Sequence, residues 1–307
     1  MKTLITGATG LIGRHLLKSI ENPVVLSRQP SESLRSLGPV DAYAWEPTAG
    51  PAPAAALEGV DVVFNLAGEP VAEGKWTGEK KRRIRDSRVA GTRNLVAGLA
   101  ALTNRPRVLV SASAVGYYAD RGDEELDERS APGHDFLAGV CVDWEREATA
   151  AAQLGIRVVC VRIGIVLAPG GGALAAMLTP FRLGVGGRLA SGRQWMPWIH
   201  IKDVAGMMLH ASRDEKIRGP MNAVAPHAVT NLDFTRALGH ALHRPTVLPM
   251  PRALLRIAFG EMSDILIASQ RVFPRVAEHG GYAFVHSDLG GALDDVMTSI
   301  ARPATAK

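Results

Sequence analysis

Three glycines spaced three residues apart lie near the start of the chain, between an apolar run and a helical pattern. The run Lys2–Thr6 predicts a short strand, and Leu11–Ile20 repeats apolar side chains near the helical period of about 3.6 residues. Gly7, Gly10 and Gly13 would permit a tight turn, close approach of the backbone to a pyrophosphate, and close packing of the helix. The pattern predicts a dinucleotide site with its pyrophosphate at the helix N-terminus. An ordinary glycine-rich turn is the weaker alternative.

Strand and helix patterns alternate through the first half of the chain. The strand candidates are continuous apolar runs, which is typical of a parallel sheet buried on both faces. We therefore expect an α/β protein: an NAD(P)-binding Rossmann fold with a doubly wound parallel sheet, and a smaller mixed C-terminal domain. Further strands are expected at Pro23–Ser27, Val60–Leu66, Arg107–Ser111 and Arg157–Ile163, helices at Lys80–Leu102 and Cys141–Leu154, and a loop with a short helix over 46–56.

The alternation loosens after residue 165. The predicted organisation is a Rossmann domain over 1–165, joined by about 195–215, and a smaller substrate-side and C-terminal domain over 166–194 and 216–300. No low-complexity linker separates the two parts, so we expect them to pack together around a cleft.

Composition excludes several classes of protein. Hydrophobic residues make up 47% and charged residues 21%, as in globular proteins. No apolar run reaches the roughly 18 residues that would predict a membrane span, and the early first strand leaves no room for a signal peptide. Cys141 and Cys160 are too few for a disulfide framework or a metal site, and buried apolar positions suit them. We expect a cytoplasmic protein with no metal and no membrane partner.

The net charge of +5 comes largely from the segment 74–88. A solvated helix face is the first interpretation of this segment, and a clamp for an anionic ligand is the second. Nucleic-acid binding is disfavoured, because the segment lacks interleaved aromatic residues and no binding motif accompanies it.

The end of the second predicted strand bears on the choice of dinucleotide. An NAD site usually places an acidic side chain there to hold the ribose 2′-hydroxyl, whereas this chain has Ser27 and Arg28. A guanidinium suits a 2′-phosphate, so the sequence predicts NADP(H) rather than NAD(H). An Arg28 that lies on the surface without a role is the alternative.

Several longer motifs resemble one family. "ITGATGLIGRHL", "NLAGEP", "SASAVGYY" and "WIHIKDVAG" are similar to the YfcH-like (SulA-like) epimerase family, an atypical branch of the extended short-chain dehydrogenase/reductases. The resemblance covers nearly the whole chain, including a C-terminal segment particular to this branch, and implies NADP across the carboxyl ends of the strands. The family's acidic contact near position 83 is replaced here by Arg83. The expected cofactor contacts are Gly7, Thr9, Gly10, Leu11, Ile12, Gly13, Ser27, Arg28, Leu66, Ala67, Gly68 and Arg88.

The usual catalytic pair of such reductases is missing. Ser113 lies where the substrate-binding serine belongs, but Leu137 and Cys141 occupy the positions of the tyrosine and lysine. Either the chain has lost this chemistry, or another group moves the proton, with Tyr117 and Tyr118 as candidates. Without a nearby cation these tyrosines would be poor bases at neutral pH. Plain packing is the alternative role for both rings.

The segment 180–203 offers a candidate substrate side. Its arginines and tryptophans suit a phosphate-bearing or planar ligand, with structural packing of the tryptophans as the alternative. For His200 and Asp203 we expect structural roles, a packed ring and a helix cap. The candidate substrate contacts are Arg182, Arg193, Trp195 and Trp198.

Two functions stay open at this stage. The first is an NADP(H)-dependent oxidoreductase or epimerase that acts on a small molecule or nucleotide sugar of unknown identity. The second is a non-catalytic NADP(H)-binding sensor or cell-division regulatory protein, favoured by the missing pair. A homodimer is left open.

Overall fold

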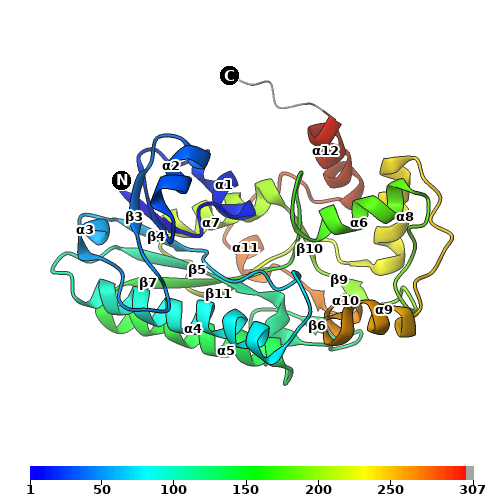
Figure 1. Cartoon of the computed structure of the whole chain (residues 1–307), viewed down its shortest axis with the longest axis horizontal. Coiled ribbons are helices and arrows are strands. Elements are labelled where there is room, and N and C mark those ends of the chain that lie inside the picture. Colours follow the sequence, from blue (N-terminus) through cyan, green and yellow to red (C-terminus); the bar gives the residue numbers. More distant parts are fainter. Residues whose placement is uncertain (302–307) are drawn as a thin grey trace.

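A parallel seven-stranded sheet forms the centre of the molecule (Figure 1). The computed structural model describes residues 1–301. The strand order is β11-β7-β5-β4-β1-β2-β3, and every neighbouring pair is parallel. The order reverses between β1 and β4, which is where open α/β sheets bind ligands. The strands are β1 (Thr3–Thr6), β2 (Pro23–Ser27), β3 (Asp41–Ala44), β4 (Val62–Asn65), β5 (Val108–Ala114), β7 (Arg157–Ile163) and β11 (Gly219–Ala223).

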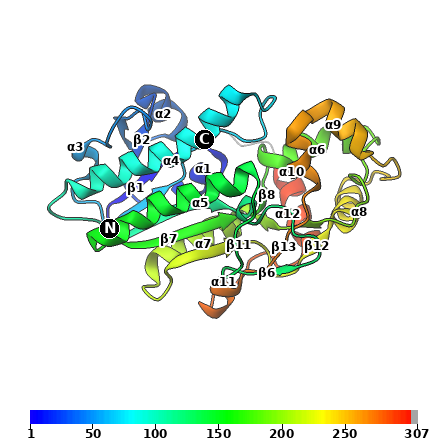
Figure 2. The same ribbon diagram turned by 90° about the horizontal axis from the view of Figure 1, so that it is seen from below.

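Helices cover both faces of this sheet (Figure 2). Neighbouring residues along one strand face opposite ways, so Leu4 and Ile5 of β1 enter two different hydrophobic clusters. One cluster packs under α1 and α7, the other under α3, α4 and α5. The helices flanking the sheet are α1 (Leu11–Leu17), α2 (Pro30–Leu37), α3 (Ala54–Leu57), α4 (Gly78–Ala100), α5 (Phe136–Thr149), α7 (Ile201–Arg213) and α11 (Arg275–His279), with 3-10 turns η1 (Val115–Tyr118) and η2 (Ala150–Leu154).

A smaller mixed part lies beyond one end of the sheet, on the right in Figure 1. Its apolar cluster includes Trp198, Phe181 and Phe234. Three short strand pairs lie within this part or at its border with the sheet: β8 (Ile165–Leu167) with β10 (Trp198–His200), β9 (Trp195–Met196) with β12 (Val229–Thr230), and β6 (Glu125–Leu126) with β13 (Arg271–Val272). The helices are α6 (Gly172–Arg182), α8 (Asn231–Leu242), α9 (Arg252–Phe259), η3 (Gly260–Met262), α10 (Ser263–Ile267) and α12 (Leu289–Ala301).

The predicted fold class is confirmed, and some local predictions need correction. Residues 219–223 form β11 and pair with β7 in the main sheet, although the sequence placed 216–300 in the smaller part. Helix α5 begins at Phe136, five residues before its predicted start, because Asp135 caps it by accepting the Ala138 N–H at 2.8 Å. Strand β3 and helix α2 were not predicted. Within residues 1–301 no helix is long and apolar enough to cross a bilayer.

Candidate functional site

Two adjoining cavities lie at the carboxyl ends of the sheet strands. The first has a volume of about 510 Å³ and lies beside the ends of β1, β2 and β4. The second has a volume of about 420 Å³ and lies beside the ends of β5 and β7. Both are lined by Gly7, Gly10 and Leu66, so they meet at the glycine turn. Together they form one cleft across the point where the strand order reverses, as expected of a dinucleotide site.

The glycine turn depends on having no side chains at two of its positions. Gly7 has a φ of +68°, and a Cβ there would lie 2.7 Å from the carbonyl carbon of Leu66. A Cβ on Gly13 would lie 2.4 Å from the Gly7 carbonyl oxygen. These contacts bring α1 against the β1 turn and the β1 turn against the end of β4. Gly10 precedes α1 and no side chain caps this helix, so backbone borders the cleft.

The strand end beside the turn is fixed by buried hydrogen bonds. The Thr6 hydroxyl donates to Asn65 Oδ1 at 2.8 Å and accepts the N–H groups of Leu66 and Ala67 at 3.0 and 3.1 Å. Asn65 Nδ2 in turn donates to Thr92 and Ser111. The predicted contacts Leu66, Ala67 and Gly68 are therefore held in place along the first cavity.

The far end of the first cavity carries two guanidinium groups. Ser27 and Arg28 line it, as predicted, and Arg14 lines it too. The Arg14 side chain donates to the carbonyls of Thr9 and Ser36 at 2.8 and 3.1 Å, which holds it against the glycine turn. Sequence reasoning missed Arg14, although a basic residue directly after the third glycine could have indicated it. The carboxylates of Glu32 and Glu46 line the same cavity, so its charge is mixed.

Arg88 is the basic residue of the segment 74–88 that lines the second cavity. Its Nη1 donates to the carbonyls of Glu69 and Ile84 at 3.0 and 3.1 Å, and its guanidinium lies over the Trp144 ring. Burial lowers the pKa of the Arg88 guanidinium below its ordinary value. A polar, anionic ligand in the cleft would stabilise this buried charge.

The neighbouring cations of this segment form ion pairs with the protein's own carboxylates. Lys80 pairs with Glu69 at 2.8 Å, and Arg85 pairs with Asp143 at 2.6 Å. Arg83 reaches Glu79 at 2.6 Å on the exposed side of α4. Arg83 and Arg85 are exposed and fit the solvated helix face, whereas Lys80 is buried in its pair with Glu69.

Ser113 lines the second cavity together with Leu137 and Cys141. The positions of the expected tyrosine and lysine thus lie on the cavity wall, with an aliphatic side chain and a thiol in their place. Burial raises the pKa of Cys141 to about 12, so the thiol is neutral at physiological pH. Neither residue supplies the proton or the cation of the usual pair.

Glu145 is a site residue that the sequence did not identify. Ser113 Oγ donates to Glu145 Oε1 at 2.6 Å. Arg162 of β7 donates to both carboxylate oxygens, from Nε at 2.8 Å and from Nη2 at 2.9 Å. Burial disfavours the charge on Arg162, but hydrogen bonds and charge interactions with Glu145 and Tyr118 together outweigh burial and raise the pKa of the guanidinium. Glu145 is one helical turn beyond Cys141, a spacing that offers little signal by itself.

The two candidate tyrosines lie behind this ion pair and do not line either cavity. Tyr118 is fully buried, and its hydroxyl donates to Asn222 Oδ1 at 2.7 Å. Burial raises the pKa of Tyr118 to about 12. The Tyr117 ring packs on the Arg162 guanidinium, 3.5 Å from ring centre to carbon. Neither candidate proton donor therefore lines the cleft, and both rings contact Arg162 instead, which agrees with the alternative of plain packing.

The predicted substrate contacts lie away from both cavities. Trp198 is 1% exposed and belongs to the core of the smaller part. Trp195 is half-buried, donates from Nε1 to Asp123 at 2.9 Å and stacks on Arg271. Arg182 and Arg193 are exposed. The packing role held open for the tryptophans is the one that the structure supports.

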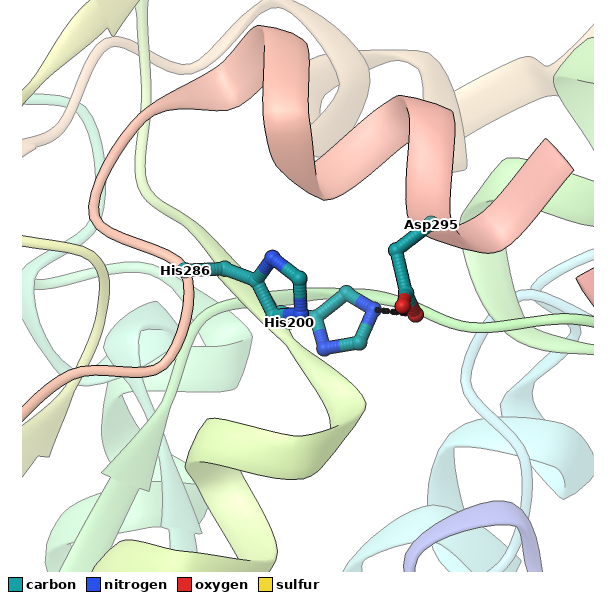
Figure 3. A group of neighbouring side chains, drawn as sticks. All are labelled: His200, His286 and Asp295. Carbon is teal, nitrogen blue, oxygen red and sulfur yellow. Dashed lines mark ion pairs between the residues drawn. The ribbon is translucent and has the colours of Figure 1, made fainter. Parts of the chain in front are cut away.

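His200, His286 and Asp295 form the one cluster with metal-ligand chemistry found among residues 1–301 (Figure 3). His200 Nδ1 accepts the Lys202 N–H at 3.2 Å, so the proton of the neutral ring is on Nε2. That Nε2 faces Asp295 Oδ2 at 3.3 Å without forming a hydrogen bond, so it offers an N–H rather than a lone pair to this carboxylate. Lys202 already pairs with the same carboxylate at 2.7 Å. The cluster is thus a polar contact between α7 and α12.

The helix cap at this point differs from the sequence expectation. His200, rather than Asp203, is the cap of α7. The Asp203 carboxylate instead accepts the N–H groups of Val285 and His286 at 2.7 and 3.0 Å, which ties the chain before α12 to the sheet domain. The structural roles expected for both residues are confirmed, but the cap was assigned to the wrong residue.

The fold and cleft define a Rossmann-type dinucleotide-binding protein. Residues 3–223 match the NAD dependent epimerase/dehydratase family, and residues 250–296 match a domain of unknown function, DUF1731. The chain belongs to the NAD dependent epimerase/dehydratase family. The YfcH and SulA labels stay predictions, because the relatives carry other names.

The relatives match this chain over nearly its full length. It is 40% identical to an epimerase family protein of Mycobacterium tuberculosis over 300 residues, 96% of this chain and 97% of the relative. It is 38% identical to the bovine epimerase family protein SDR39U1 over 311 residues, 97% and 100% of the two chains. The crystal structure of human SDR39U1 with NADPH has a TM-score of 0.86 at 34% identity, and covers 97% of this chain and 99% of its own.

Proposed function

We propose that this protein binds NADP(H) across the two cavities. The observation that carries the proposal is the pair of guanidinium groups, Arg14 and Arg28, beside Ser27 in the cavity that continues through the glycine turn to Ser113. Two fixed positive charges suit a 2′-phosphate better than a free ribose hydroxyl. The NADPH in the human SDR39U1 structure supports the same choice.

The residues present fit such a cofactor. The glycine turn lets backbone approach the pyrophosphate, and the partly buried Arg88 offers a positive charge at the wall of the second cavity. The aliphatic walls of the second cavity, Leu137 and Val140 among them, exclude water from the ring that would lie there. A bound nicotinamide would supply hydride chemistry beside Ser113.

We infer that the protein is an oxidoreductase or epimerase that acts on a small molecule. It keeps the substrate-binding serine, Ser113, but has Leu137 and Cys141 in place of the usual catalytic tyrosine and lysine. A specific observation favours the alternative, a non-catalytic NADP(H)-binding sensor or cell-division regulator: Leu137 and Cys141 lie on the cavity wall where the pair would act. Both functions need the same cofactor, so cofactor binding alone does not separate them.

Calorimetric titration with NADPH and NADH tests the cofactor, and turnover tests the reaction. We expect NADPH to bind more tightly, and Arg28→Asp to remove the preference. Equal affinity for both dinucleotides would contradict the assignment. Wild-type protein and Ser113→Ala are then incubated with NADPH and a panel of carbonyls, quinones and nucleotide sugars. Turnover lost in Ser113→Ala supports an enzyme. No turnover, with a partner captured only in the presence of NADPH, supports the sensor.

A further inference from the structure

The Ser113 hydroxyl uses its single proton in a hydrogen bond within the protein. That proton is donated to Glu145 Oε1 at 2.6 Å, a short hydrogen bond to a carboxylate. A serine hydroxyl has one proton and two lone pairs. Ser113 therefore offers lone pairs to anything that lies in the second cavity, and is poised to accept a hydrogen bond.

Glu145 cannot readily turn away from Ser113, because Arg162 holds both of its oxygens. Arg162 is 3% exposed and is itself held. Its Nη1 donates to the Tyr118 hydroxyl at 3.0 Å, and the Tyr117 ring covers its face. The direction of the Ser113 hydrogen bond is thus fixed by buried contacts behind the cavity wall.

The same cavity wall offers few other groups that could take a proton. Among its described side chains, Arg88 is a cation that only donates, and Cys141 is a neutral thiol with a pKa of about 12. Trp144 donates its ring N–H to Thr92 at 2.9 Å. The Ser113–Glu145 pair is the proton acceptor that this wall presents.

We propose that Ser113 and Glu145 form a proton relay, and that the substrate carries a hydroxyl group on its reacting carbon. The substrate O–H bond breaks and its proton passes to Ser113 Oγ, while the Ser113 proton passes to Glu145 Oε1. One proton moves from substrate to carboxylate, and the Arg162 charge is unchanged. A bound oxidised nicotinamide supplies the acceptor for the hydride, which leaves the carbon with both electrons as the alcohol becomes a carbonyl.

This proposal rests on the proposed function, since it needs the dinucleotide in the cleft. Ser113 is the catalytic residue, because it touches the substrate. Glu145 acts through Ser113 and is a positioning residue that also receives the proton. The carboxylate need not be a strong base, because an alcohol becomes more acidic as hydride leaves its carbon.

Binding of matched probes tests the direction of the hydrogen bond. Cyclohexanol can donate to Ser113 and cyclohexanone cannot, so we expect NADP⁺-loaded protein to bind the alcohol about two- to tenfold more tightly, as one hydrogen bond allows. Dissociation constants come from ligand-observed NMR titration. Ser113→Ala should bind the two probes equally. Equal binding by the wild type, or preference for the ketone, would overturn the proposal.

Turnover tests the relay itself. With cyclohexanol and a panel of larger secondary alcohols, Glu145→Gln should lower kcat by about 10²–10⁴-fold, the usual contribution of general base catalysis. KM for NADP⁺ should not change. The control is Glu147→Gln, the same change two residues along α5, where the carboxylate pairs with Arg93 at 2.8 Å outside the cavity. It should keep full kcat.

Glu145→Gln leaves Arg162 short of a charge partner and could fail to fold for that reason. In that case the probe titration with wild type and Ser113→Ala decides, because it reports the direction of the hydrogen bond and Ser113→Ala leaves the ion pair intact. Unchanged kcat in the folded variant, or no alcohol oxidised by the wild type, overturns the relay. Calorimetry separates this from failure of the proposed function: NADPH binding without alcohol oxidation contradicts the relay alone, and no NADPH binding contradicts both.

Discussion

Substitution of Gly13 by alanine tests the close contact on which the cleft is built. A Cβ at this position would lie 2.4 Å from the Gly7 carbonyl oxygen and 2.7 Å from Ala8 Cα. Ordinary contact begins at 3.4 Å, so α1 and the glycine turn must separate by about 1 Å. Overpacking of this kind destabilises a fold by about 1–3 kcal/mol.

The same displacement should also weaken cofactor binding. The turn that would hold the pyrophosphate moves with α1. A misplacement of about 1 Å at a functional site can lower its catalytic rate about 10²-fold, and we expect binding to be similarly sensitive. We expect Gly13→Ala to raise the Kd for NADPH by one to two orders of magnitude. Calorimetry measures the Kd, and urea unfolding followed by circular dichroism measures stability.

Gly139→Ala is the matched control. Gly139 lies within α5, where an added Cβ meets no atom within 4 Å. Alanine should stabilise this helix by up to about 1 kcal/mol, with unchanged NADPH affinity. If Gly13→Ala binds NADPH as well as the wild type and unfolds at the same urea concentration, the close-contact argument is refuted.

Three further predictions concern charge and protonation. Arg14→Ala and Arg28→Ala should each reduce the preference for NADPH over NADH, by at most about 10- to 100-fold for a charge-assisted contact, as measured by the ratio of the two Kd values. The Cys141 thiol, with a pKa of about 12, should resist iodoacetamide at pH 8 in the folded protein and react after urea unfolding, as measured by mass spectrometry. Burial lowers the pKa of His200 to about 4 from an unfolded value of 6.5, so the unfolded state binds more protons between these values, and stability should fall by up to about 3 kcal/mol as pH drops through this window. His200→Asn keeps a helix-capping side chain and should flatten that slope in urea unfolding at a series of pH values.

Features written in adjacent residues could be predicted from the sequence. The glycine turn, Ser27 and Arg28 at the end of β2, and the missing pair at Leu137 and Cys141 each depend on a few neighbouring positions. Buried strands such as β7 were located because their apolar runs are continuous. Strand β3 escaped because its four residues, Asp41–Ala44, are only partly buried at the sheet edge and carry little hydrophobic signal.

Features created by packing between distant segments could not be predicted. Strand β11 joins the sheet by pairing with β7, which lies about 60 residues earlier. The segment "GPMNA" contains no sequence pattern that predicts this pairing. The contact between Ser113 and Glu145 joins a strand to a helix 32 residues away. The tyrosines of "VGYY" lie four and five residues after Ser113, yet the η1 turn directs them behind the cavity wall.

The buried polar network behind Ser113 has a consequence for the C-terminal part of the chain. Asn222, which accepts from Tyr118, donates from Nδ2 to the Phe273 carbonyl at 3.0 Å. Glu128 Oε1 accepts the N–H groups of Asn222 and Val276 at 3.0 and 3.2 Å. The orientation of the Ser113 hydroxyl therefore depends, through this hydrogen-bond network, on how a segment about 160 residues downstream packs against the sheet. Exchanging that C-terminal segment between relatives should therefore alter reactivity at the cleft, even though none of the described residues 250–301 lines either cavity.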